Sequence, residues 1–415
     1  MSSIGKYRFL LVASLLVLLL VGCSKSESGN GMNSSTDGNT TSQATTATIP
    51  TGTSSSGIAP SPSATQTASS PASEAPPATD QASLGKVTAL RLADFQSGWA
   101  GGEGWIARTD NGGKSWTKQL EHKYIVNQLF ALNRNEAWAA LDIGDSKGLQ
   151  LLHTTNGGKK WITDGSVPNH DFLHFVTSKE AFSGSARTTD GGQTWTTLKV
   201  PDSIAGDAYF HDRNNGWAVT QGTNKFNIMR TTDGGKTWRS AMSRATVSPV
   251  TGVVIRSAGN NDAWVELIGD SGMSQTSYSL FHTADGGRAW IPVLANNQAG
   301  SGPAPGYEMD KPTKVPHNKG AGPGTLYVVN SQTAFMGGKC MACDLPNTMG
   351  KTLDGGKTWV NLPAEFAGYG EQYIAAADAK HIWWINSDNT ESSIMYTSSD
   401  GGRNWNKTYT FAKPK

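Results

Sequence analysis

The chain has 415 residues, of which 37% are hydrophobic and 16% charged. Its 35 basic and 33 acidic residues nearly balance, which argues against nucleic acid and against a polybasic membrane contact. Only three cysteines occur, so cysteine use is sparse.

The first 22 residues have the pattern of a signal peptide. Lys6 and Arg8 form a positive start, and the apolar stretch Phe9–Leu20 is too short for a membrane-spanning helix. The sequence LVGC that ends at Cys23 resembles a bacterial lipobox, which implies cleavage before Cys23 and a diacylglyceryl group on its thiol. We expect an exported protein anchored to the outer face of a bacterial cytoplasmic membrane, or to an outer membrane in a Gram-negative cell. An ordinary signal peptide with an incidental cysteine is the alternative.

Residues 23–84 are predicted to be a disordered tether. They are nearly all Ser, Thr, Ala, Gly, Pro, Gln and Asn, and no periodic apolar pattern could offset the entropy of ordering them. A flexible coil of this length spans about 45 Å on average, enough to hold a domain away from a membrane.

Residues 85–415 contain one short phrase seven times: Thr or Ser, any residue, Asp or Asn, Gly, Gly, two residues and Trp. Asp/Asn-Gly-Gly between apolar segments predicts a tight hairpin turn, in which Gly adopts positive φ and the Asp and Thr side chains accept backbone hydrogen bonds. The Trp is expected to be buried over the turn. The copies are Thr109–Trp116, Thr154–Trp161, Thr188–Trp195, Thr231–Trp238, Thr283–Trp290, Thr352–Trp359 and Ser398–Trp405.

A looser phrase with a central aromatic residue precedes each copy, and further apolar segments flank both phrases. Each unit therefore holds about four short strands, and successive phrase tryptophans lie 45, 34, 43, 52, 69 and 46 residues apart. Seven such units predict an all-β fold, a seven-bladed β-propeller of four-stranded antiparallel blades. The aromatic residues of the looser phrase are Trp99, Trp138, Phe182, Trp217, Trp264, Phe335 and Trp383.

The repeated phrase resembles the Asp-box, or BNR, repeat. This repeat is shared by sialidases, some glycoside hydrolases, sortilin-type receptors and photosystem II assembly factors, and the last group is the most similar in style. The resemblance covers about residues 86–411. It implies a single seven-bladed propeller with the box at the blade periphery, away from binding sites.

Most tryptophans occupy repeated positions, which predicts a structural role for them rather than a role in ligand binding. Twelve of the fourteen close a phrase or occupy the aromatic position of the looser phrase. Only Trp105 and Trp384 stand outside the pattern. Each is either a wedge between blades or a platform for a ligand.

The sequence shows no complete catalytic set. The Arg-Ile-Pro phrase of sialidases is absent, and Arg108, Arg187 and Arg230 directly precede the repeated phrase, as surface residues would. A glycosidase would need two carboxylates about 5–9.5 Å apart, for which the candidates are Asp171, Asp207 and Glu371. The histidines His170, His174 and His211 lack metal-ligand spacing, so we expect no metal and no cofactor.

Two segments, one in the sixth unit and one directly before it, depart from the repeat. Cys340 and Cys343 form CMAC, which is compatible with a local disulfide, with buried free thiols, or with redox or metal chemistry. A long loop from Leu294 to Gly324 is expected to lie along the rim of one face near the central channel. It is either a solvated insertion or a partner-binding loop. Its contact residues would be Tyr307, Glu308, Asp310 and Lys311.

These features predict a monomeric, lipid-anchored, extracytoplasmic propeller that binds or scaffolds a protein or a cell-envelope glycan and is not an enzyme. A surface glycoside hydrolase of Asp-box ancestry is the alternative from another class. A photosystem-type assembly factor is a second alternative.

Overall fold

The computed structural model describes residues 83–144, 148–297, 301–309, 311, 313–339 and 345–414. The predicted signal peptide, lipidation site and tether therefore lie outside the described residues, apart from Ser83 and Leu84 at the end of the tether. The described part contains 26 strands and no helix. Accordingly, it offers no helical segment with the length and apolarity to cross a membrane.

The strands of the described part form six antiparallel sheets, in which neighbours in the sheet are also neighbours in sequence. The six-stranded first sheet holds β1 (Val87–Leu92), β2 (Gly98–Thr109), β3 (Thr117–Ala131), β4 (Ala137–Asp142), β5 (Leu149–Thr154) and β6 (Ile162–Val167). The next two sheets hold β7 (Leu173–Phe175), β8 (Ala181–Ser183), β9 (Ala186–Thr188) and β10 (Thr196–Thr197), then β11 (Tyr209–Phe210), β12 (Gly216–Gly222), β13 (Lys225–Thr231) and β14 (Arg239–Ala245).

The last three sheets have four strands each. They hold β15 (Gly252–Arg256), β16 (Ala263–Ser271), β17 (Thr276–Thr283) and β18 (Ile291–Asn296), then β19 (Gly322–Val328), β20 (Ala334–Lys339), β21 (Asn347–Thr352) and β22 (Val360–Phe366), then β23 (Gly370–Ala376), β24 (Ile382–Asp388), β25 (Ile394–Ser398) and β26 (Asn406–Thr410).

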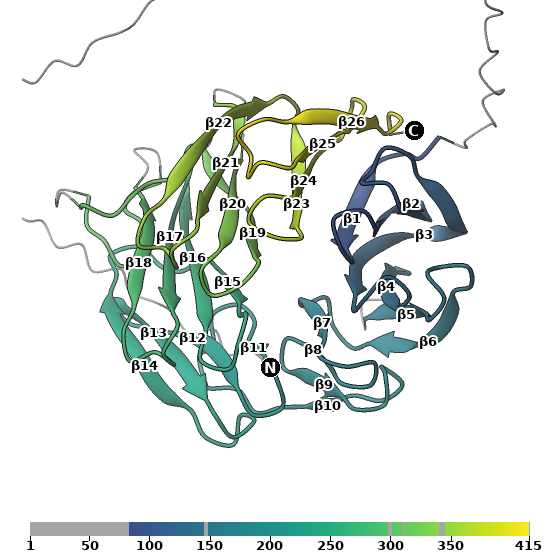
Figure 1. The fold of residues 1–415 in the computed structure, drawn as a ribbon. Coiled ribbons are helices and arrows are strands. Elements are labelled where there is room, and N and C mark those ends of the chain that lie inside the picture. The colour runs from purple at the N-terminus through teal and green to yellow at the C-terminus, as the bar shows by residue number, and fades with distance from the viewer. Residues whose placement is uncertain are drawn as a thin grey trace, which may run out of the picture. The chain divides into compact units, whose positions relative to one another are not determined.

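The sheets follow one another around a common centre, as blades of a β-propeller (Figure 1). The strands nearest the centre are the first of each sheet together with the second half of β3, and neighbouring ones contact each other. The all-β propeller with four-stranded antiparallel blades is therefore confirmed.

The predicted count of seven separate blades is wrong, because the described strands form six sheets. The reason lies in β3, which runs unbroken for 15 residues. Its first part pairs with β2, from Thr117 opposite Arg108, and its second part pairs with β4, ending at Ala131 opposite Ala137. No turn interrupts β3 between these two pairings, so the first two repeat units share one six-stranded sheet.

All seven repeated phrases form the same locked turn. In each, the Thr or Ser hydroxyl accepts a hydrogen bond of 2.8–3.0 Å from the second Gly N–H. The Asp or Asn carboxyl or amide oxygen accepts one of 2.9–3.0 Å from the N–H four residues on. Both glycines have φ between +72° and +105°. The predicted turn and its side-chain locks are confirmed.

The core is formed by the aromatic residues of the looser phrase rather than by the phrase tryptophans. All seven side chains at the looser-phrase position are 0% exposed. Of the phrase tryptophans only Trp116 is buried, while the other six are half-buried. The expectation that every phrase Trp is buried is therefore wrong for six of the seven, although Trp195 and Trp405 do donate to the carbonyl of the second Gly of their turns.

In three repeat units the residue directly before the phrase links that unit to the next one. Arg108 lies 4.6 Å over the Trp99 ring and donates to the carbonyl of Gly157 in the next phrase. Lys351 Nζ lies 2.6 Å from the carbonyl of Gly401 in the same way. His282 repeats the arrangement with Gly355. Arg108 thus joins two units, and is not the plain surface residue that the sequence suggested.

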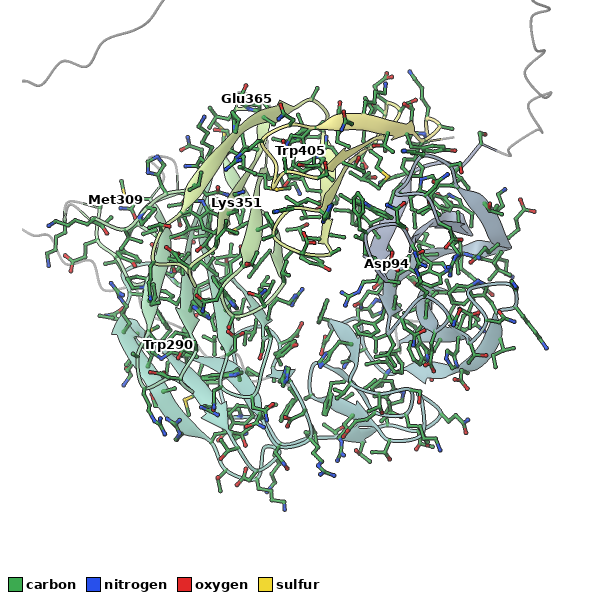
Figure 2. All side chains as sticks on the ribbon, in the orientation of Figure 1. Asp94, Trp290, Met309, Lys351, Glu365 and Trp405 are labelled. Atoms are coloured by element: carbon green, nitrogen blue, oxygen red, sulfur yellow. The ribbon has the colours of Figure 1, made fainter. Side chains whose placement is uncertain are left out.

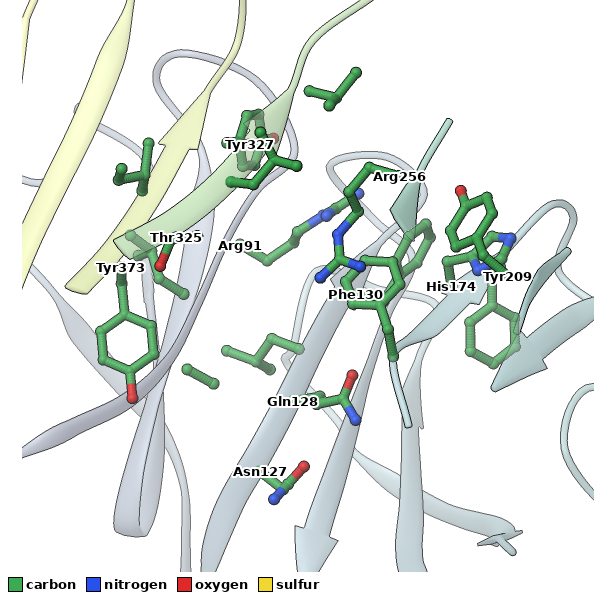
Figure 3. Close-up of a pocket in the computed structure, with 18 of the residues that line it drawn as sticks. Arg91, Asn127, Gln128, Phe130, His174, Tyr209, Arg256, Thr325, Tyr327 and Tyr373 are labelled. Carbon is green, nitrogen blue, oxygen red and sulfur yellow. The ribbon is translucent and has the colours of Figure 1, made fainter. Parts of the chain in front are cut away.

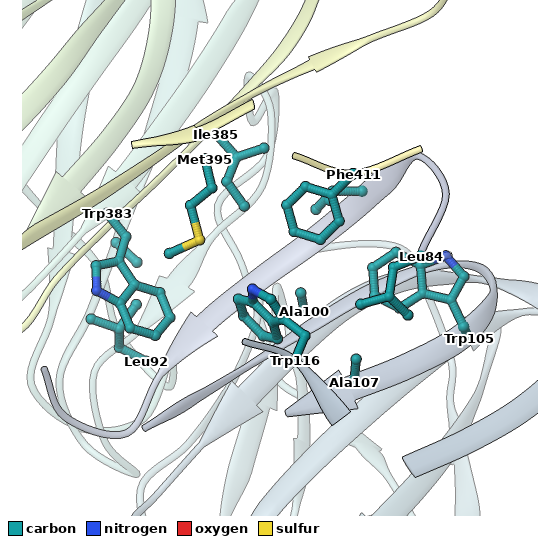
Figure 4. Packing of buried hydrophobic residues seen from close by; sticks show 12 residues of the cluster. Leu84, Leu92, Ala100, Trp105, Ala107, Trp116, Trp383, Ile385, Met395 and Phe411 are labelled. Carbon is teal, nitrogen blue, oxygen red and sulfur yellow. The ribbon is translucent and has the colours of Figure 1, made fainter. Parts of the chain in front are cut away.

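A buried cluster closes the ring between the first and last sheets (Figure 4). Trp105 stacks on Phe411, with ring centroids 6.1 Å apart, and the Ala412 N–H donates to the Leu84 carbonyl at 2.7 Å. Trp384 is also fully buried, stacked on Phe366 at 4.6 Å. Both tryptophans that depart from the repeat are therefore packed between blades, where a ligand cannot reach their faces.

We predict that Trp264→Ala lowers the free energy of unfolding by about 3–5 kcal/mol, because it leaves a cavity in a closely packed core. Trp238→Ala should cost only about 1–2 kcal/mol, because its ring is half-buried. Urea unfolding followed by circular dichroism measures both changes. An equal or larger loss for Trp238→Ala would contradict this account of the core.

Candidate functional site

A cavity of about 650 Å³ occupies the centre of the propeller (Figure 3). Side chains of β1, β3, β7, β11, β19 and β23 line it, together with Arg256 at the end of β15. Concave sites of this size hold small ligands or parts of larger partners. We call this cavity the channel.

The repeat places one residue per unit beside the channel. In each unit the aromatic residue of the looser phrase pairs with a residue on the strand nearest the centre. This partner lies eight positions before the aromatic residue in the chain. Six of the seven residues line the channel. This set, which we call the channel ring, consists of Arg91, Phe130, His174, Tyr209, Arg256, Tyr327 and Ala375.

Two arginines of the channel ring approach the same part of the cavity from different sheets (Figure 3). Arg256 Cζ lies 3.7 Å from the centroid of the Phe172 ring, and Arg91 Cζ lies 4.5 Å from that of Phe130. Among the described residues, neither guanidinium forms an ion pair with a carboxylate, and Arg91 Nε is buried without a partner. The channel thus holds two positive charges on rigid aromatic supports.

Burial lowers the pKa of Arg256 to about 10, and the positive charge of Arg91 adds to this effect. Nearby Glu266 and Tyr209 act in the opposite direction. Glu266 is only 2% exposed, and burial raises its pKa to about 8 although Arg256 opposes the shift. Burial therefore opposes the charged form of both groups, and the two side chains form no ion pair in the described part of the chain.

His174 faces the same cavity as an uncharged ring. It is 8% exposed and stacks on Tyr209 with centroids 4.9 Å apart. Burial lowers its pKa to about 3, with smaller contributions from His211 and Arg256. Neither ring nitrogen has a hydrogen-bond partner among the described residues. The same part of the chain contains no group of three His, Cys, Asp or Glu side chains that could hold a metal.

The three candidate carboxylates do not converge on one pocket. Asp171 and Asp207, in the loops before β7 and β11, lie near enough for the charge of Asp207 to raise the pKa of Asp171, and neither lines the channel. Glu371 does line the channel, where it pairs with Lys339 at 2.6 Å. Of the three candidates only Glu371 therefore faces the channel, so they do not form a glycosidase pair of carboxylates there.

The loop with Tyr307, Glu308 and Lys311 lies away from the channel, so its expected place near the central channel is wrong. Hydrogen bonds fix it to the blades instead: Ser279 Oγ donates to the Pro305 carbonyl at 2.9 Å, and Arg244 Nε donates to that of Gly306 at 2.7 Å. Met309 in the same loop lies at the outer edge of the propeller (Figure 2). Asp310, Cys340 and Cys343 lie outside the described residues.

Arg91 and Arg256 are not among the site residues predicted from the sequence, although their spacing from the repeated aromatic residues marks them. Both lie eight residues before an aromatic of the looser phrase, a position that also holds Phe130, His174 and Tyr209. Alignment of the repeats at that position, rather than at the conspicuous turn phrase, would have found the channel ring.

Known proteins with some similarity to this chain are distant from it in sequence. A xyloglucanase from a Paenibacillus species is 23% identical over 311 residues, which cover 67% of this chain and 28% of that relative. A YCF48 structure with a bound D1 peptide has a TM-score of 0.44 at 15% identity, covering 77% of this chain and 92% of its own. The GH74 xyloglucanase of Xanthomonas campestris has a TM-score of 0.47 at 15% identity. The match covers 78% of this chain and 53% of the xyloglucanase. No family model matches the chain.

We predict that Asp171→Asn stabilises the protein at neutral pH. Burial, followed by the charge of Asp207, raises the pKa of Asp171 from 3.8 to about 6. The stability contributed by protonated Asp171 is therefore complete below about pH 4 and is lost as the pH rises through 6. At pH 7.5 the variant should be more stable by up to about 2 kcal/mol, and at pH 4 the difference should vanish.

Urea unfolding at both pH values measures the effect of Asp171→Asn. Asp202→Asn, which changes an exposed carboxylate in a nearby loop, is the control and should alter stability little at either pH. A pH-independent effect of Asp171→Asn would contradict the carboxyl pair.

Proposed function

We propose that this chain is a non-enzymatic binding propeller that holds an anionic group of a protein or cell-envelope glycan in the channel. The observation that carries the proposal is the pair Arg91 and Arg256, which share one cavity without a carboxylate partner among the described residues. Burying unpaired charge is costly, and a bound anion would relieve that cost.

The chemistry of the channel ring suits such a ligand. A guanidinium offers planar, paired N–H donors to a carboxylate or phosphate, and the rings beneath Arg91 and Arg256 restrict the motion of their side chains. The rings of Phe130, Tyr209 and Tyr327 supply apolar surface for the uncharged part of the ligand. The channel is therefore best suited to a ligand whose anionic group binds the two arginines and whose uncharged part contacts the aromatic rings.

The alternative of a surface glycoside hydrolase has less support. Its simplest form needs two separated carboxylates facing one substrate, whereas Glu371 is the one carboxylate among the described residues that line the channel. A photosystem-type assembly role would be a special case of the binding proposal, with a photosystem protein as the partner.

We further propose that the protein is exported and lipid-anchored through Cys23, with residues 24–84 as its tether. The lipobox-like LVGC and the polar composition of the following segment support this placement. An exported binding module on a long tether can reach both envelope glycans and other exported proteins.

Arg256→Gln should weaken binding of an anionic probe by about 10- to 100-fold, because hydrogen bonds to charged groups contribute about 1.5–3 kcal/mol. Calorimetric titration with an acidic peptide tests for a protein ligand, and titration with an oligogalacturonide tests for a glycan ligand. Arg288→Gln, which removes an exposed arginine from a turn phrase, is the control and should bind as the unaltered chain does. Failure of both probes to bind, or turnover of the glycan, would contradict the proposal.

Cys23→Ser should move the protein from the membrane to the soluble fraction of a bacterial host and abolish incorporation of labelled palmitate. Cys343→Ser is the matched control and should leave both unchanged. Equal palmitate incorporation in the two variants would show that Cys23 is not the anchor.

A further inference from the structure

A second cavity, of about 760 Å³, lies at the outer edge of the propeller, between the end of β14 and the long loop that joins β18 to β19. Its size is in the range of sites for small organic ligands. Its described lining is mixed, with the cations Arg244, Lys311 and Lys314 on one hand and apolar Pro292 and Val315 on the other. We call it the edge pocket.

The loop wall of the edge pocket is held in place by hydrogen bonds. Ser279 Oγ donates to the Pro305 carbonyl at 2.9 Å, and the Tyr307 N–H donates to the Ala304 carbonyl at 2.9 Å. The Gly306 N–H donates to Thr246 Oγ1 at 3.3 Å, and Ala304 is fully buried. This part of the loop is therefore a built wall rather than a solvated insertion.

The same wall fixes a guanidinium. Arg244 Nε donates to the Gly306 carbonyl at 2.7 Å, which holds one edge of the group. Arg244 Cζ lies 4.4 Å from the centroid of the Tyr307 ring and 5.4 Å from that of Phe281, and these two rings are nearly parallel at 8°. A cation held in this way loses little entropy when it binds a ligand.

The charge of the edge pocket is not balanced by the described residues that line it. Three cations face one carboxylate, that of Glu308, which already pairs with Lys311 at 2.9 Å. Arg244 and Lys314 form no ion pair in the described part of the chain. Two positive charges of the edge pocket therefore have no carboxylate partner among the described residues.

Tyr307 adds a hydrogen-bond donor beside this charge. Its hydroxyl is buried next to the Arg244 guanidinium, and no acceptor among the described residues takes its proton. Burial raises the pKa of Tyr307, although Arg244 opposes the shift, so the O–H persists at neutral pH. An oxyanion at this point would accept from both Tyr307 and Arg244.

We infer that the edge pocket is a binding site for a small soluble molecule that carries a phosphate or carboxylate group. Arg244 and Lys314 supply the charge, Tyr307 donates its O–H, and Pro292 and Val315 contact the apolar part of the ligand. The site is separate from the channel and does not depend on the function proposed for it.

The test is calorimetric titration of the full chain with phenyl phosphate and with benzoate as probes. We expect both to bind. Arg244→Gln should weaken binding at least tenfold, and Tyr307→Phe, which keeps the ring, should weaken it about three- to tenfold. Lys314→Gln changes an exposed side chain, so it tests the charge without disturbing the wall. Lys236→Gln, an exposed lysine of a turn phrase, is the control and should have no effect.

Three outcomes would overturn the inference. The first is no binding of either probe at millimolar concentration. The second is binding that survives Arg244→Gln, Tyr307→Phe and Lys314→Gln but is lost with Arg91→Gln, which would place the probe in the channel. The third is binding only to vesicles that contain phosphatidylglycerol, which would indicate a lipid surface rather than a soluble ligand.

Discussion

One cross-strand pair, repeated around the propeller, determines both the core and the channel. In each repeat unit an aromatic residue of the looser phrase pairs with the residue eight positions earlier, on the strand nearest the centre. The aromatic side chain, such as Trp264, is excluded from solvent between blades, and this burial holds the strand beside it in register. Its partner, such as Arg256, is thereby fixed at the channel. The rigidity of the channel lining is thus a consequence of how the core packs.

The locked turns and the linking cations act on the opposite side of each blade. Each phrase fixes one hairpin through its own hydroxyl and carboxyl or amide oxygens, and the N–H of its first Gly also donates to the turn between the two preceding strands. Arg108 and Lys351 then join one unit to the next through the carbonyl of that same Gly. The periphery is therefore held by polar contacts and the interior by aromatic packing. This division explains why the conspicuous phrase is structural and the channel ring is left free to vary in chemistry.

The features that repeat could be predicted from the sequence. The features that depend on contacts between distant residues could not. The turn locks and the fold class could be predicted, because Asp-Gly-Gly and the aromatic spacing act locally. The joining of two units through β3 could not be predicted. The chain stays extended near Tyr124 because it pairs with β2 and β4, and not because of a local sequence preference. The position of the Tyr307 loop depends on Arg244 and Ser279, which are remote in sequence. Arg91 and Arg256 could have been found, but only by aligning the repeats on the second-strand aromatic.

The central claim is that Arg91 and Arg256 form one anion site in the channel. The most direct measurement is anomalous X-ray diffraction from crystals of the protein soaked in selenate, a heavy oxyanion that guanidinium groups bind as they bind phosphate. The account predicts an anomalous peak between the two guanidinium groups, within hydrogen-bond distance of both. Selenate peaks elsewhere on the propeller, with an empty channel and the two arginines turned apart, would contradict it.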